Sequence, residues 1–75
     1  MNKIDARRYG IIVRFADFDG EYCYEAKIQE LPSIAEYADT FEEAYNLAID
    51  SIESLAEVYS EQGKIFPKPL VGSEV

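Results

Sequence analysis

The chemically reactive residue types in this chain are one cysteine and a few carboxylates around a single turn. Cys23 is the only cysteine, and the 75-residue chain contains no histidine. Without an imidazole to take its proton, the thiol lacks the usual general base of a cysteine nucleophile. As a small side chain in an alternating segment, Cys23 needs no catalytic role. We therefore expect a protein that is not an enzyme.

Asp17, Asp19 and Glu21 surround Gly20 and suggest a metal-binding loop. An EF-hand places its last glutamate six residues after the glycine, whereas Glu21 follows Gly20 directly. Asp-Gly is instead typical of a tight hairpin turn, because both residues tolerate positive φ. We expect a turn with no metal and no cofactor, and residual metal chemistry is the remote alternative.

The charge balance limits the possible partners. Fifteen acidic residues against seven basic ones give a net charge of −8, which argues against nucleic-acid binding and favours a basic partner, or solubility alone. One cysteine and no signal peptide suit the cytoplasm, and no apolar run is long enough to span a membrane. The length predicts one domain over residues 1–75, small enough that a dimer would supplement its core.

Two segments, 9–16 and 21–28, alternate in hydropathy and predict a β-hairpin around residues 17–20. With Ala16 opposite Glu21, Phe15 would face Tyr22, and every pair on one face would be apolar. That face is the expected cover for a helix. Residues 34–38 predict a third strand after the Leu31-Pro32 break. Residues 1–8 predict a frayed arm or a strand start, and 64–71 an edge strand or extended arm.

A long amphipathic helix is predicted over residues 41–62. Thr40 and Glu43 form a capping-box pattern at its start, and Gly63 is suited to the residue after its end. Its apolar positions recur at helical spacing. They are Phe41, Ala44, Tyr45, Ala48, Ile49, Ile52, Leu55, Ala56 and Tyr59.

The order of these parts resembles the HicB antitoxins, the partners of the HicA toxins. The resemblance spans residues 9–69 and implies an α+β domain of order β-β-β-α-β: a small antiparallel sheet covered on one face by one long helix, with a degenerate RNase H-like fold. The matching positions are Asp19 and Gly20 at the turn, Leu31 and Pro32 after the second strand, Asp39, Thr40, Glu42, Glu43 and Ala44 at the helix start, and Gly63, Pro67 and Pro69 in the tail.

The chain also departs from the family pattern. Ser33 and Ala38 stand where the family usually has glycine, and Ile34 where a cysteine is common. Many HicB proteins continue into a C-terminal DNA-binding module, whereas this sequence stops after the proline tail. The resemblance therefore implies a toxin-binding domain without that module.

The resemblance implies an antitoxin domain that occludes a small basic RNA-cleaving toxin of the HicA type. From the charge pattern we expect the contact at the hairpin carboxylates Asp17, Asp19, Glu21 and Glu25, which the predicted register directs away from the helix. The alternative is a stand-alone structural or regulatory homodimer with no toxin.

Overall fold

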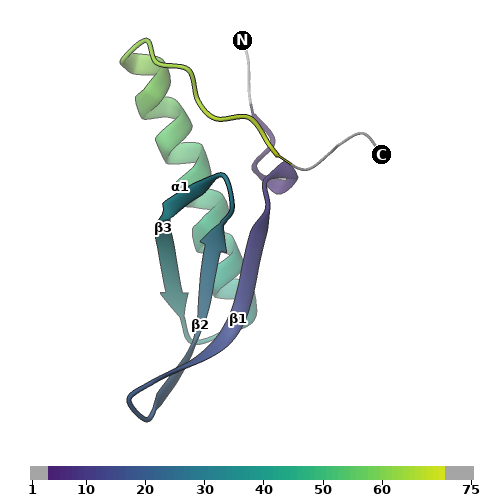
Figure 1. The fold of residues 1–75 in the computed structure, drawn as a ribbon, viewed down its shortest axis with the longest axis vertical. Coiled ribbons are helices and arrows are strands. Elements are labelled where there is room, and N and C mark those ends of the chain that lie inside the picture. Colours follow the sequence, from purple (N-terminus) through teal and green to yellow (C-terminus); the bar gives the residue numbers. More distant parts are fainter. Residues whose placement is uncertain (1–3, 71–75) are drawn as a thin grey trace.

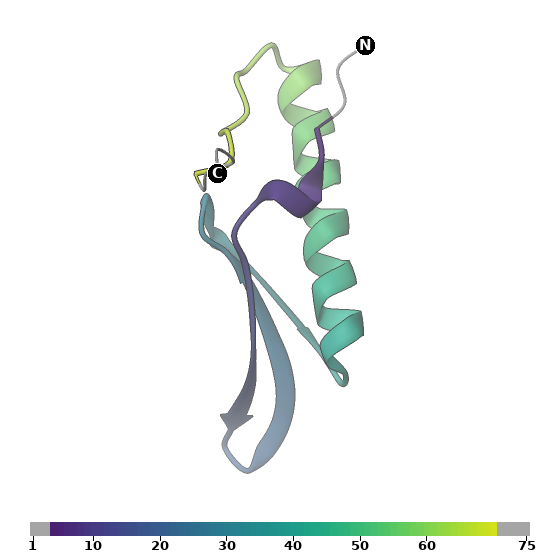
Figure 2. The ribbon, with the colours of Figure 1, turned by 90° about the vertical axis from the view of Figure 1, so that its right-hand side faces the viewer.

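Residues 4–70 form a three-stranded antiparallel sheet with one long helix packed on one face (Figures 1 and 2). The computed structural model describes residues 4–70. The predictions made above for residues 1–3 and for Val71 therefore lie outside the described residues. The elements are η1 (Ala6–Arg8), β1 (Ile11–Phe18), β2 (Glu21–Ile28), β3 (Leu31–Ala38) and α1 (Phe41–Glu61). The predicted α+β class, with a helix on one face of an antiparallel sheet, is confirmed.

Helix α1 begins and ends close to where the sequence predicts. The Glu43 amide donates to Thr40 Oγ1 at 3.1 Å, which satisfies one of the free N–H groups of the first turn. At the other end Gly63 has φ +71°, and the Lys64 amide donates to the Tyr59 carbonyl at 2.8 Å. This is a Schellman ending, which requires a left-handed residue after the cap.

The core between helix and sheet is built largely from small side chains. Ala26 on β2 and Ala44 and Ala48 on α1 are fully buried, so the helix backbone can approach the sheet closely. Ile28 and Ile52 are the largest fully buried side chains. Burial of each of these two side chains contributes about 1.5–3 kcal/mol to the stability of the folded state. So few large buried groups make a thin core.

The hairpin register differs by two residues from the prediction. Phe18 pairs with Glu21, and Phe15 lies opposite Tyr24 instead of Tyr22. The turn contains only Asp19 (φ 61°) and Gly20 (φ 89°), as in a type I′ turn that matches the strand twist. A shift of two residues keeps every side chain on its face, so hydropathy alone does not distinguish the two registers.

Strand β3 is longer than the predicted 34–38 segment. A tight turn at Gln29 and Glu30 returns the chain directly, and β3 begins at Leu31. Pro32 is accommodated because β3 is an edge strand, where a missing N–H costs no ladder bond. The register shifts between Lys27 and Ile28, so the start of β3 is irregular.

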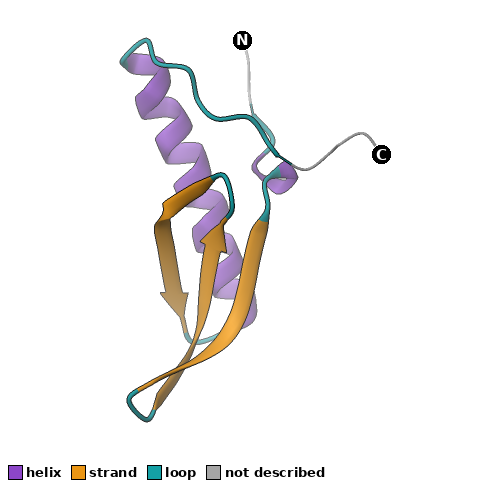
Figure 3. Cartoon of the chain, in the orientation of Figure 1, coloured by secondary structure: helices purple, strands orange, loops and turns teal. Residues whose placement is uncertain are grey.

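Of the two segments that flank the sheet and helix, the first differs from its prediction, whereas residues 64–70 agree with the extended-arm alternative. Instead of a frayed arm or strand, Ala6–Arg8 form a 3-10 turn, capped by Asp5 accepting from the Arg7 amide. The final strand implied by the β-β-β-α-β order does not form within residues 62–70, which run as an extended loop (Figure 3).

This loop is fastened to the start of the sheet. Tyr9 Oη donates to the Pro67 carbonyl at 2.6 Å, and Glu30 accepts from the amides of Gly10 at 3.0 Å and Leu70 at 2.7 Å. The Phe66 ring contacts the rings of both Tyr9 and Tyr59. The loop therefore covers the end of the core without joining the sheet.

Candidate partner-binding surface

The end of the β1–β2 hairpin projects beyond the rest of the molecule. The last pair between β2 and β3 joins Tyr24 to Ala38, and α1 starts at Phe41 and runs back along the sheet. Residues 16–23 therefore form a two-stranded ribbon with no third strand, visible at the bottom of Figure 1. The helix side of this hairpin end is exposed at Asp17 and Tyr22, whereas Phe18 on the other side packs against Tyr37 of β3.

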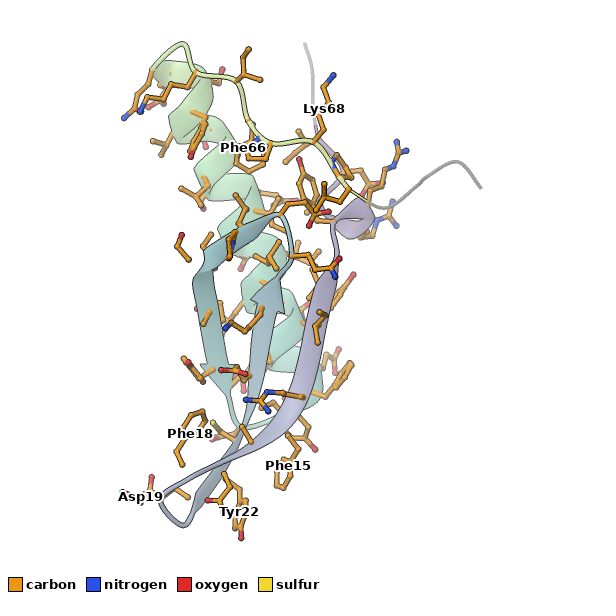
Figure 4. The ribbon with its side chains drawn as sticks, in the orientation of Figure 1. Phe15, Phe18, Asp19, Tyr22, Phe66 and Lys68 are labelled. Atoms are coloured by element: carbon orange, nitrogen blue, oxygen red, sulfur yellow. The ribbon has the colours of Figure 1, made fainter. Side chains whose placement is uncertain are left out.

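Exposed aromatic rings gather on the helix side of the hairpin end. Phe15 stacks on Tyr22 with 5.4 Å between ring centroids, and Tyr24 touches both Phe15 and Phe41. Phe15 is 59% exposed, Tyr22 62% and Phe41 56%. The prediction that Phe15 and Tyr22 pack under the helix is therefore wrong, because the ribbon extends past the helix start. Phe41 contacts Tyr24 from the predicted apolar side of the helix but remains largely exposed. Figure 4 shows Phe15 and Tyr22 side by side near the turn.

The opposite face of the hairpin carries a buried carboxylate. Glu25 is only 6% exposed, and its Oε1 accepts from Arg14 Nε at 2.7 Å. Tyr37 Oη donates to Oε2 of the same carboxylate at 3.3 Å, and the Phe18 ring meets Tyr37 edge-on. This cluster fixes β1, β2 and β3 against one another without the helix.

The hydrogen bonds explain the charge states of this cluster. The bond from Arg14 holds the pKa of Glu25 below its ordinary value, and the same contact raises the pKa of Arg14. Burial, followed by the nearby Glu25 charge, raises the pKa of Tyr37. Near neutral pH Glu25 is therefore an ionised, paired group within the sheet.

The four carboxylates named from the sequence have different environments. Asp19 and Glu21 are exposed at the tip, and Asp17 Oδ1 accepts from the Gly20 amide at 2.9 Å while remaining exposed. Glu25 was expected to point to solvent from the predicted register. That expectation is wrong, because the observed register puts Glu25 directly opposite Arg14. Of the three exposed carboxylates, Asp17 lies opposite Tyr22 on the face of the exposed rings, Asp19 lies in the turn, and Glu21 lies opposite Phe18 on the other face.

The remaining candidate groups show no assembled chemistry. Cys23 is a half-buried free thiol opposite Ala16 on the hairpin. Within residues 4–70 no cluster of three or more histidine, cysteine or acidic side chains is arranged to hold a metal ion. None of the helices described there combines the length and apolar character that crossing a bilayer requires.

A groove of about 360 Å³ lies at the other end of the molecule, beside the extended loop. Arg8 and Lys68 give it basic groups, in contrast to the acidic tip. The remaining lining residues are Ile4, Asp5, Tyr9, Phe66, Pro67 and Pro69.

The aromatic part of the tip does not follow from the hydropathy pattern. Phe15 and Tyr22 follow the same two-residue apolar alternation as the core residues of their strands, so this pattern does not indicate that they are exposed. The signal available in the sequence was the length of the predicted strands: segments 9–16 and 21–28 are longer than the predicted third strand 34–38, so part of the hairpin had no predicted neighbour. Comparison of the chain with protein-family models, curated proteins and solved structures found no match.

Proposed function

We propose that this domain acts by binding, as a HicB-like antitoxin that occludes a small basic RNA-cleaving protein. The observation that carries the proposal is the projecting hairpin end, which exposes Phe15 and Tyr22 on one face. Asp17 shares that face, Asp19 lies in the turn, and Glu21 lies on the other face, so the tip combines aromatic rings with acidic groups. Aromatic centres with a polar rim are typical of protein interfaces. The RNase H-like relationship is part of this proposal.

The motif positions of the HicB resemblance support it in their structural roles. Asp19 and Gly20 form the tight turn, Thr40 caps α1, and Gly63 ends it. The order of three antiparallel strands and a helix agrees with the first four elements that the resemblance implies.

The chemistry of the tip favours a basic partner. The charged side chains of residues 17–21 are all acidic, and Arg14, the nearest cation on β1, is paired with Glu25. Long-range attraction between such a tip and a basic protein raises the association rate, whereas aromatic burial at the centre slows dissociation. The two contributions are therefore separable by kinetics.

The first test measures association with the product of the gene next to this chain's own, as a function of ionic strength. Asp19→Asn with Glu21→Lys removes two negative charges from the tip and adds one positive charge, a net change of +3, and asparagine tolerates the positive φ at position 19. We expect slower association and a weaker salt dependence. Glu53→Lys with Glu57→Gln makes the same charge change on exposed positions of α1 and should have a smaller effect on both.

The second test concerns the aromatic centre. Tyr22→Ala should accelerate dissociation at least about tenfold, as expected for an aromatic anchor, while Val58→Ala on the exposed side of α1 should not. The parent domain should also inhibit RNA cleavage by the partner in proportion to complex formed. An absence of binding by the parent would refute the antitoxin function and leave the homodimer without a toxin.

A further inference from the structure

The two edges of the sheet differ in their protection against another strand. β3 contains Pro32, and its register against β2 is irregular; both features discourage edge pairing. β1 contains neither proline nor glycine and pairs with β2 in one unbroken register. In the sheet formed by residues 4–70, no fourth strand pairs with β1. β1 is therefore the open edge.

The backbone groups available along this edge follow from the hairpin ladder. The Gln29 amide donates to the Gly10 carbonyl at 2.9 Å, so Gly10 directs its backbone groups toward the β2 side. Hydrogen-bonding direction alternates along an antiparallel strand, so Val13, Phe15 and Asp17 direct N–H and C=O away from β2. These are the groups that a further strand would need.

Large apolar side chains also lie exposed along β1. Ile12 is 50% exposed, Phe15 59% and Phe18 43%. They occupy both faces of one strand, with Phe15 on the helix side and Ile12 and Phe18 on the other. A strand added at the edge would bring side chains beside all three.

We propose that β1 pairs with β1 of a second copy of this chain, antiparallel and about a two-fold axis at Phe15. In this register Phe15 lies opposite its own counterpart, and Ile12 lies opposite Phe18 in both directions. The two Phe15 residues exchange backbone hydrogen bonds, since Phe15 directs both groups outward. Both helices then lie on the same face of one continuous sheet.

Neighbouring registers are less complementary. Centring the pair on Arg14 places two guanidinium groups directly opposite each other, which is destabilising. Centring it on Val13 leaves Phe18 without an apolar partner, and centring it on Ala16 places Phe15 opposite Asp17. Only the Phe15-centred register pairs all three exposed apolar residues, and it leaves Arg14, already bonded to Glu25, opposite Ala16.

Charge predicts how the dimer responds to salt. Each chain carries −8, but β1 itself contributes one cation, Arg14, and one anion, Asp17. The contact is apolar and the long-range force is repulsive, so added salt should strengthen the dimer by screening. Binding of a basic partner at the tip should respond in the opposite way, which distinguishes the two interactions.

Disulfide cross-linking tests the register. In a Cys23→Ser background, Phe15→Cys should give a covalent dimer under mild oxidation, because hydrogen-bonded antiparallel pairs have Cα atoms about 5.5 Å apart, within disulfide range. Tyr22→Cys is the matched control: it is 62% exposed on the same face, but one strand in from the edge. A mixture of Val13→Cys and Asp17→Cys chains should give the mixed disulfide in preference to either symmetric one.

Sedimentation equilibrium without any partner tests the dimer itself, at about 0.1 and 0.5 M NaCl. We expect the parent to dimerise more tightly at high salt, Phe15→Lys to be a folded monomer by circular dichroism, and Tyr22→Lys to dimerise like the parent. A monomeric parent at both salts, or equal cross-linking at positions 15 and 22, would overturn the proposal. If Phe15→Lys does not fold, the cross-linking result decides. If the parent is monomeric and a basic partner protects the β1 amides from hydrogen exchange, the β1 edge binds that partner and not a second copy.

Discussion

At the scale of single residues, Glu25 shows how a charged position became part of the sheet. Its carboxylate is bonded by Arg14 on β1 and Tyr37 on β3, so one side chain links all three strands. Removal of its charge should loosen this face of the sheet while leaving the core under α1 unchanged. The sequence gives no local sign of this role, because Arg14 and Tyr37 lie 11 and 12 positions away.

We expect Glu25→Gln to be less stable than the parent at neutral pH and to lose less stability in acid. The folded chain holds the pKa of Glu25 below its ordinary 4.5, so the stabilisation is complete above 4.5 and is lost as pH falls through the folded value. Thermal melts between about pH 7 and 3 measure this, with Glu53→Gln as the exposed control. If the variant and the parent lost stability equally as the pH fell, the assigned role of the Glu25 charge would be contradicted.

At the scale of elements, α1 depends on the contact between Ile52 and the sheet. The Ile52 side chain is fully buried, with 0% of its surface exposed to solvent. Ile52→Ala should cost about 2–5 kcal/mol, and Ile52→Asp should unfold the domain because no partner is available for the buried charge. Glu53→Lys, on the solvent side, should change stability by about 0.5 kcal/mol or less. Chemical denaturation of the three variants measures the differences, and equal losses at 52 and 53 would show that the helix face is assigned wrongly.

Elements were predictable where the controlling interactions are local. Thr40 and Gly63 mark the ends of α1 because capping involves neighbours within a few residues. The Asp19-Gly20 turn was predictable too, but the two-residue register shift was not, since both registers keep the same faces. The exposure of Phe15 and Tyr22 depends on where β3 and α1 end in space, which hydropathy does not encode.

At the scale of the whole molecule, charge should prevent nucleic-acid binding. The chain carries −8, and two of its cations, Arg7 and Arg14, are paired with Asp5 and Glu25. At physiological salt the domain alone should not retard DNA or RNA in a gel, because counterion release needs several free cations along a phosphate backbone. Tight binding that weakens steeply with added salt would contradict this expectation.

Because hydrogen bonds hold the extended loop against the start of the sheet, both ends of the described chain lie at one end of the molecule. Ile4 and Pro69 line the same groove, and the Asp19-Gly20 turn lies at the opposite end of the molecule (Figures 1 and 4). A tether attached beside Ile4 or Leu70 would therefore leave the hairpin end free for a partner. The same proximity suits circular permutation: a short linker could join residues 70 and 4, and new termini could open at an exposed loop such as the turn after α1, where insertions are best tolerated.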